Sequence, residues 1–195
     1  MQRFIVSDIF GRTDALENMA DQLPGQVQII DPYNGKHMNF SDEADAYEYF
    51  VSHVGLKEYK NILINQVREI SEPLTLLGFS VGASAIWSIS DNALLKSITG
   101  ALAFYGSQIR NAQEVTPRFP VKLIFPEAEK HFDVSELIPS LLRKRNTDGI
   151  QVEYLHGFMN YYSPNYDSKG YEEYLTKLQL IPEEECFCRI KLDNN

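Results

Sequence analysis

Short apolar runs alternate along the chain with longer segments in which apolar residues recur at helical spacing. The runs predict strands, and the spaced segments predict amphipathic helices. We expect strands at 3–7, 27–30, 74–79, 99–105, 120–125 and 150–155, and helices at 13–23, 41–54, 56–70, 82–90, 134–145 and 171–180. Because the two kinds alternate, the sequence predicts an α/β fold with a mainly parallel sheet flanked by helices on both faces.

Polar residues at the expected helix starts support these boundaries. Thr13 or Asp14 could cap the first helix, and Ser41 the second, ahead of an acidic first turn. Gly55 is expected to end that second helix. In a parallel sheet the functional site lies at the carboxyl ends of the strands. The loops to search are therefore 8–12, 31–37, 79–82, 105–110, 126–133 and 156–163.

One of these loops carries the pattern Gly78-x-Ser80-x-Gly82, directly after the apolar run that begins at Leu74. A strand, a sharp turn and a helix with serine at the apex form a nucleophile elbow. The reversal is so tight that the positions two before and two after the serine have almost no room for a side chain. The sequence thus predicts a strained Ser80 with an exposed hydroxyl.

A serine hydroxyl needs a neighbouring base to become a nucleophile. Of the four histidines, His53 falls inside an expected helix, His37 precedes the serine, and His131 lies in the 126–133 loop. His156 follows the last expected strand and comes last in the order serine, acid, histidine that this motif requires. We therefore predict His156 as the base.

The acid that orients the histidine should follow the strand ending at Phe125. Glu127, Glu129 and Asp133 are the candidates in that loop. The turn Pro126-Glu127-Ala128-Glu129 favours Glu129, whereas Asp133 could instead cap the next helix. Glu129 is the preferred acid, and Asp133 stays open as the alternative.

Two backbone N–H groups are expected to stabilise the negative charge on a reacting carbonyl oxygen. One belongs to Val81, directly after the serine, and the other to Ile9, in the loop after the first strand.

Composition narrows the class of protein. The 195 residues suit one domain, and the net charge of −9 argues against a nucleic-acid partner. No apolar run reaches membrane-spanning length and no secretory signal is evident, so we expect a cytoplasmic protein without a membrane partner. Cys186 and Cys188 lack the further ligands of a zinc site, and we expect them to be reduced thiols.

Taken together, these motifs resemble the dienelactone hydrolase family of the α/β-hydrolase superfamily over most of residues 3–180. The resemblance rests on the following segments: Ser7-Asp8-Ile9-Phe10-Gly11, Asp31-Pro32-Tyr33, Gly78-Phe79-Ser80-Val81-Gly82, Phe104-Tyr105-Gly106 and His156-Gly157-Phe158. It implies an α/β-hydrolase fold, a hydrolase triad, and neither a metal nor an organic cofactor.

The chain departs from that family at four matching positions. Ser80 replaces a cysteine nucleophile, Asp8 a glutamate, Glu129 an aspartate, and Asn160 an arginine that holds a substrate carboxylate. These differences weigh against dienelactones as substrates.

The sequence as a whole predicts a serine hydrolase that cleaves a small carboxylic ester, lactone or thioester through an acyl-enzyme. The alternative is a hydrolase-fold protein that binds a ligand or partner without turnover. We expect residues 1–195 to form one domain without an inserted cap, in which 181–195 is a tail of unassigned role.

Overall fold

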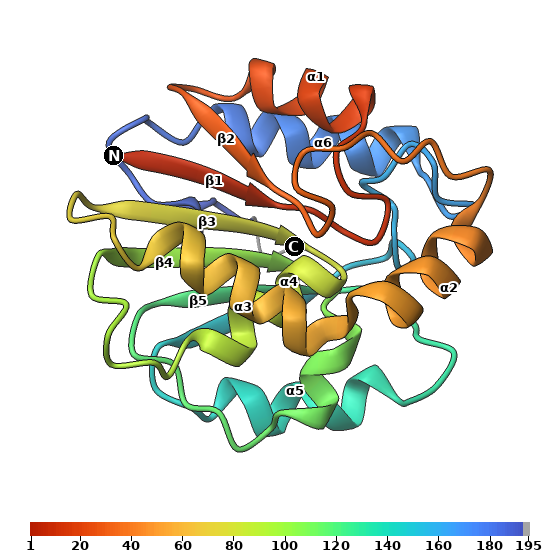
Figure 1. Cartoon of the computed structure of the whole chain (residues 1–195). Helices are drawn as coiled ribbons and strands as arrows, with labels where there is room; N and C mark the ends of the chain where they lie inside the picture. Colours follow the sequence, from red (N-terminus) through yellow and green to blue (C-terminus); the bar gives the residue numbers. More distant parts are fainter. Residues whose placement is uncertain (193–195) are drawn as a thin grey trace.

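The computed structural model describes residues 1–192, and its centre is a sheet of six parallel strands (Figure 1). Their order in the sheet is β2-β1-β3-β4-β5-β6, and all neighbours are parallel. The strands are β1 (Gln2–Val6), β2 (Val27–Ile30), β3 (Leu74–Phe79), β4 (Ile98–Phe104), β5 (Val121–Phe125) and β6 (Thr147–Gln151). The order reverses between β1 and β3, and this reversal places the loops after both strands side by side.

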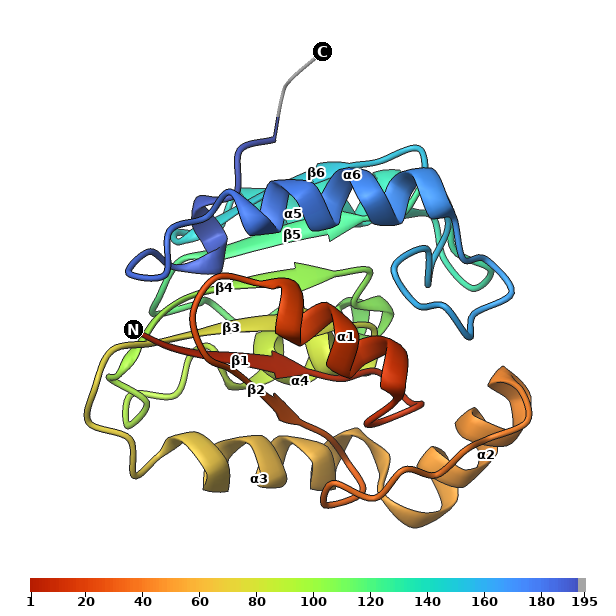
Figure 2. The ribbon, with the colours of Figure 1, turned by 90° about the horizontal axis from the view of Figure 1, so that it is seen from above.

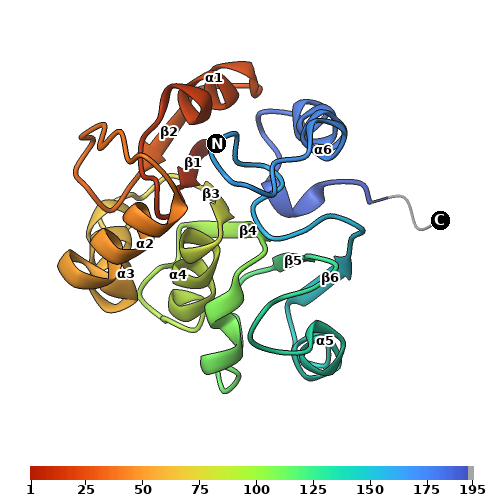
Figure 3. The ribbon, with the colours of Figure 1, turned by 90° about the vertical axis from the view of Figure 1, so that its right-hand side faces the viewer.

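Helices cover both faces of the sheet, as predicted (Figure 3). One face carries α1 (Asp14–Gln22) and α6 (Ser168–Gln179), and the other carries α3 (Gly55–Val67), α4 (Val81–Ile89) and α5 (Val134–Leu142). The helix α2 (Glu43–His53) precedes α3, and two short 3-10 helices, η1 (Ser107–Asn111) and η2 (Phe187–Arg189), follow β4 and α6.

The strand β3 explains why the sheet needs both layers. All six of its residues are buried. Leu76 packs into the core under α3 and α4, and its neighbour Leu77 packs into the core under α1 and α6. Successive side chains point to opposite faces of a strand. A central strand that is apolar at every position therefore fits only between two helical layers.

Side-chain caps set the starts of several helices. Thr13 caps α1 as predicted, because its hydroxyl accepts the N–H of Leu16. The prediction of Ser41 as the cap of α2 is wrong. Asp42 is the cap, and its carboxylate accepts the N–H of Asp45 at 2.9 Å. The Ser41 hydroxyl instead donates to the Asp45 carboxylate.

The last strand begins and ends earlier than the pattern predicted, at Thr147–Gln151 rather than 150–155. Asp148 and Gly149 are poor strand formers, which hid its start. They pair with β5 nonetheless, and Lys122 of β5 lies 3.2 Å from the Asp148 carboxylate. His156 therefore follows an irregular segment rather than the strand itself.

The segment after α6 packs against the end of the sheet where the strands begin (Figure 2). Arg3 of β1 is fully buried there, and its guanidinium donates to the carbonyl oxygens of Pro24, Ile181, Pro182 and Glu185. It also lies 4.9 Å from the centroid of the buried Phe187 ring. The described part of the tail is therefore anchored to the core. Residues 193–195 lie outside the described residues.

The expectation that Cys186 and Cys188 are free thiols is wrong in this structure, because a disulfide joins them. Their Cα atoms are 5.4 Å apart, within the usual range for a disulfide. A Cβ atom added at Gly100 would lie 2.6 Å from the Cys188 sulfur, so the bridge packs directly on β4. Sequence spacing alone does not report this packing.

No helix within residues 1–192 combines the length and the apolar character needed to cross a membrane.

Replacing Arg3 should destabilise the fold. In Arg3→Met, four carbonyl oxygens lose their donor, and we expect the free energy of unfolding to fall by about 3 kcal/mol. Arg3→Lys should lower the free energy of unfolding by a smaller amount, because an ammonium group replaces only part of the hydrogen bonding of the planar guanidinium. Urea unfolding measures both. Arg68, whose side chain is 56% exposed, provides the control substitution Arg68→Met, with an expected change below about 0.5 kcal/mol. An equally small change in Arg3→Met would contradict the anchoring role.

Candidate active site

The turn between β3 and α4 holds Ser80 in a conformation that residues other than glycine rarely adopt. Its φ is 51° and its ψ is −111°. A Cβ atom at Gly78 would lie 2.8 Å from the Ala83 nitrogen, and one at Gly82 would lie 2.2 Å from the Val6 carbonyl oxygen. Neither position could hold a larger residue without moving backbone. The strained turn predicted from this pattern is confirmed.

Three side chains from different loops meet at this turn. The Ser80 Oγ lies 2.9 Å from His156 Nε2, and His156 Nδ1 lies 2.7 Å from Glu129 Oε1. With a proton on Nδ1, the imidazole donates to the carboxylate and accepts the serine O–H. The side chains of His156 and Glu129 are 21% and 11% exposed, so the contact is largely shielded from water.

Backbone hydrogen bonds bring the loops of Glu129 and His156 together. The N–H of Glu127 donates to the Tyr154 carbonyl at 2.8 Å, and the side chain of Gln151 donates to the Glu127 carbonyl at 2.9 Å. The turn after β5 is thus tied to the irregular segment after β6. The pairing of β5 with the edge strand β6 therefore helps to bring Glu129 within reach of His156.

The backbone around His156 is fixed as well. Gly157 has a φ of +90°, and a Cβ atom there would lie 2.4 Å from the Ser163 hydroxyl oxygen. Asn165 donates its side-chain amide to the His156 carbonyl at 2.9 Å, and the Tyr105 ring centroid lies 4.9 Å from that of His156. The imidazole is held between this tight loop and an aromatic wall.

Asp133, the alternative acid, has a different role in the structure. It is the N-cap of α5, and its carboxylate accepts the N–H and the hydroxyl of Ser135. These hydrogen bonds lower the pKa of Asp133.

The two predicted oxyanion donors lie in neighbouring segments. Val81 is the first residue of α4, and Gly82 beside it packs on the carbonyl groups of Val6 and Ser7 at the end of β1. Ile9 follows in the next turn, where its carbonyl accepts the Tyr33 hydroxyl at 2.6 Å. The use of the Ile9 and Val81 N–H groups as oxyanion donors stays a prediction.

The remaining histidines lie elsewhere. His53 stacks on Tyr49 in α2, and His131 is exposed. His37 lies within 3.5 Å of Asp14 and Glu17, and among residues 1–192 this trio comes closest to a set of metal ligands. Arg12 already pairs with Glu17 at 2.8 Å, so the cluster is an ion-pair network at the surface.

A carboxylate that the predicted site does not include lies next to the triad-like contact. The side-chain amide of Asn160 donates to Asp8 Oδ2 at 2.5 Å, and the N–H of Phe10 donates to Asp8 Oδ1 at 2.9 Å. Burial raises the pKa of Asp8 to about 6, although both hydrogen bonds and the nearby His156 lower it. The pattern places Asp8 at the end of a strand, but nothing in it reveals contact with a residue so distant in sequence.

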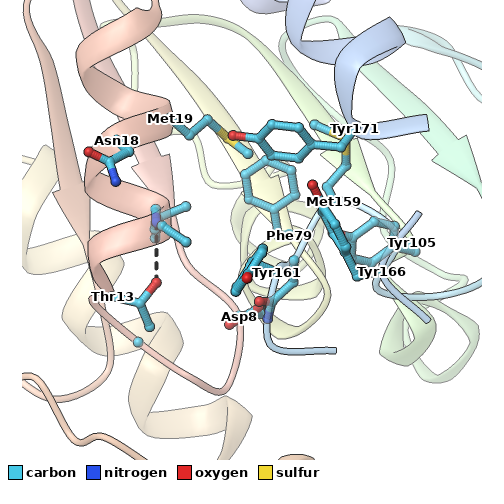
Figure 4. Close-up of a pocket in the computed structure, with 14 residues that line it drawn as sticks. Asp8, Thr13, Asn18, Met19, Phe79, Tyr105, Met159, Tyr161, Tyr166 and Tyr171 are labelled. Atoms are coloured by element: carbon cyan, nitrogen blue, oxygen red, sulfur yellow. Dashed lines mark hydrogen bonds between the residues drawn. The ribbon is translucent and has the colours of Figure 1, made fainter. Parts of the chain in front are cut away.

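Asp8 and Asn160 border a cavity of about 200 Å³ between α1 and the segment before α6 (Figure 4). Side chains of α1, including Asn18 and Met19, lie on one side, and Met159 lies on the other. Further lining comes from Phe79 and Tyr105, from Leu16, and from the tyrosines of the 161–171 segment: Tyr161, Tyr166 and Tyr171. Phe79 precedes Ser80 in the chain, and the Tyr105 ring contacts His156, so two of the lining residues neighbour the serine and the histidine, which are not themselves among the lining residues.

Sequence comparison places one curated relative beside this chain. The uncharacterized protein YczH of Bacillus subtilis strain 168 is 38% identical over 122 residues, which cover 61% of this chain and 59% of the relative. The match thus spans little more than half of the relative's length. No family model matches the chain.

Three solved structures show the same architecture at low sequence identity. The match to a dienelactone hydrolase-like promiscuous phosphotriesterase from metagenomic libraries covers 90% of this chain and 83% of that protein, with 12% identity and a TM-score of 0.60. The match to the thioesterase domain of the curacin biosynthetic pathway covers 90% of this chain and 89% of that domain, with 11% identity and a TM-score of 0.59. The match to Est1E from Butyrivibrio proteoclasticus covers 91% of this chain and 85% of that protein, with 9% identity and a TM-score of 0.58. The chain therefore has the α/β-hydrolase fold.

Proposed function

We propose that this protein is a serine hydrolase of the α/β-hydrolase superfamily that cleaves a small carboxylic ester, lactone or thioester. The observation that carries the proposal is the continuous contact from Ser80 through His156 to Glu129. A serine on a strained turn, hydrogen-bonded to a histidine that an acid orients, is the arrangement that nucleophilic catalysis requires.

In the proposed reaction, Ser80 Oγ attacks the substrate carbonyl carbon while its proton moves to His156 Nε2. The Glu129 carboxylate accepts the Nδ1–H and stabilises the imidazolium that forms. The bond from carbon to the leaving oxygen or sulfur then breaks, and the proton on Nε2 passes to the leaving group. Water, deprotonated by the same nitrogen, attacks the acyl carbonyl and releases Ser80.

In this proposal, the N–H groups of Val81 and Ile9 donate hydrogen bonds to the negatively charged carbonyl oxygen. Val81 begins α4, whose N-terminus carries partial positive charge. The steric fit of Gly82 on the end of β1 keeps that terminus close to the Ile9 loop. Donors fixed before the reaction stabilise a developing oxyanion without reorganisation.

The structural neighbours agree with this class of reaction. Their names include a thioesterase domain and a dienelactone hydrolase-like phosphotriesterase. The cavity of about 200 Å³ is smaller than the roughly 300–1,000 Å³ of typical ligand pockets, which supports a small substrate.

Asp8 gives independent support for a functional site at this place. An ionised carboxyl with a raised pKa destabilises the folded chain at neutral pH. Such costs are concentrated at functional sites, where stability is exchanged for chemistry.

Labelling with a fluorophosphonate tests the activated serine. We expect the wild type to be labelled near neutral pH, whereas Ser80→Ala and His156→Ala should lose labelling and at least about a thousandfold in kcat on an activated ester. His131→Ala, at an exposed position of the 126–133 loop, is the control and should retain both. A well-folded wild type that turns over no ester and takes no label would support the alternative of a binding protein.

The choice of acid can be tested with two isosteric amides. Glu129→Gln should lower kcat by about a hundredfold or more, because the amide cannot stabilise the imidazolium. Asp133→Asn should change kcat by less than about twofold, since asparagine caps a helix as well as aspartate does. Steady-state kinetics on one ester decides between them, and the reverse ranking would assign the role to Asp133.

The raised pKa of Asp8 predicts a pH-dependent gain of stability in Asp8→Asn. Below about pH 4, Asp8 is protonated in the folded and the unfolded chain, and above about pH 6 it is ionised in both. Between these values the wild type should lose about 3 kcal/mol relative to the variant as the pH rises. Urea unfolding of both proteins from pH 3 to pH 8 measures this difference. A difference that does not vary with pH would contradict the assignment.

A further inference from the structure

We propose that the cavity lined by Asp8, Phe79 and Tyr105 recognises a substrate group that carries an alkylammonium ion, through the Asp8 carboxylate. A hydroxyl group would bind more weakly there, and a carboxylate would be rejected. The proposal rests on the proposed hydrolase function for its catalytic meaning, and it adds the class of substrate. It follows from the charge, the hydrogen bonds and the shape of the cavity.

Asp8 is the single charged residue among those of the 1–192 range that line the cavity. Within that described range, no lysine, arginine or histidine lines the cavity to balance a substrate carboxylate. An anionic group placed there would face an unneutralised carboxylate in a partly buried space, where like charges repel strongly. The lining therefore selects against acids.

The orientation of Asp8 is fixed by its neighbours. Asn160 donates one amide N–H to Asp8, and its own carbonyl oxygen accepts the N–H of Tyr162 at 2.8 Å. The amide cannot flip without losing both hydrogen bonds. The N–H of Phe10 holds the second carboxylate oxygen. A carboxylate can accept about four hydrogen bonds, so two donors leave it with capacity for a ligand.

The other residues that line the cavity suit the alkyl chain of a substrate that ends in an ammonium group. Leu16, Met19, Phe79 and Met159 provide apolar surface along the walls. Tyr105 lies near Asp8, and burial together with the Asp8 charge raises the pKa of its hydroxyl, which therefore stays neutral. Aromatic walls also attract a cation. An alkyl chain that ends in an ammonium ion satisfies the apolar walls and the charged end together.

A bound cation offsets the main free-energy cost of keeping Asp8 ionised in a buried position. Burial disfavours its ionised form, and an ammonium ion at hydrogen-bond distance restores the interaction that water would supply. A neutral hydroxyl offers one donor but no charge.

Binding of small probes to the wild type tests the recognition without any turnover. The probes are pentylammonium, pentanol and pentanoate, and the readout is the chemical shift of the Asn160 side-chain amide. We expect pentylammonium to bind at least about tenfold more tightly than pentanol, and pentanoate to cause no saturable shift. Asp8→Asn should remove the preference. Asp14→Asn, which removes an exposed carboxylate of α1, should keep it. Equal binding of the three probes, or a preference that survives in Asp8→Asn, would overturn the proposal.

Kinetics on isosteric esters then separates this proposal from the proposed function. The acyl pair is aminohexanoyl and heptanoyl p-nitrophenyl esters, and the alcohol pair is dimethylaminoethyl and isopentyl acetates. We expect the cationic member of one pair to have a kcat/KM at least about tenfold higher, and Asp8→Asn to bring that ratio near one. Ammonium binding without Ser80-dependent turnover would uphold the cavity assignment and refute the hydrolase. Ser80-dependent turnover with equal rates within both pairs would refute the ammonium site alone.

Discussion

The close approach of α4 to the end of β1 is the contact on which the site depends. Gly82 fits against the carbonyl oxygens of Val6 and Ser7, and no larger residue could occupy that space. This contact forces the reversal after β3 and holds Ser80 at a positive φ. It also places the loop of Ile9 beside the first turn of α4. The position of Ser80, its helix and the loop that borders the cavity are thus set by one steric constraint.

Electrostatics divides the site into two parts that differ in character. Around Ser80, the His156 imidazole lies within hydrogen-bond distance of both the serine hydroxyl and the Glu129 carboxylate. In the loop after β1, Asp8 accepts hydrogen bonds from Phe10 and Asn160. Among the described residues that line the cavity, no cationic side chain accompanies it. The first arrangement suits chemistry on any carbonyl, and the second suits selection of a substrate. Both are anchored to the same loops at the carboxyl ends of the strands.

Much of this arrangement follows from local sequence. The buried run before Gly78 and the glycines around Ser80 predict the strand and its turn, because the steric demand acts within a few residues. Other features depend on contacts between distant segments. Asp148 and Gly149 adopt a strand only because β5 pairs with them. Asp8 meets Asn160, and Arg3 meets the tail, only once the chain has folded. The prediction of reduced thiols at Cys186 and Cys188 is wrong for the same reason, since the packing of their disulfide against Gly100 is not visible in the spacing.

The proposed reaction requires that Ser80 forms a covalent acyl intermediate. The direct measurement is rapid mixing with p-nitrophenyl acetate, an acid quench, and mass spectrometry of the digested protein. We expect a burst of nitrophenolate equivalent to the amount of protein, and one acetyl group on the peptide that contains Ser80. An acetyl group on another residue that accounts for the turnover, or turnover that persists in Ser80→Ala, would contradict it.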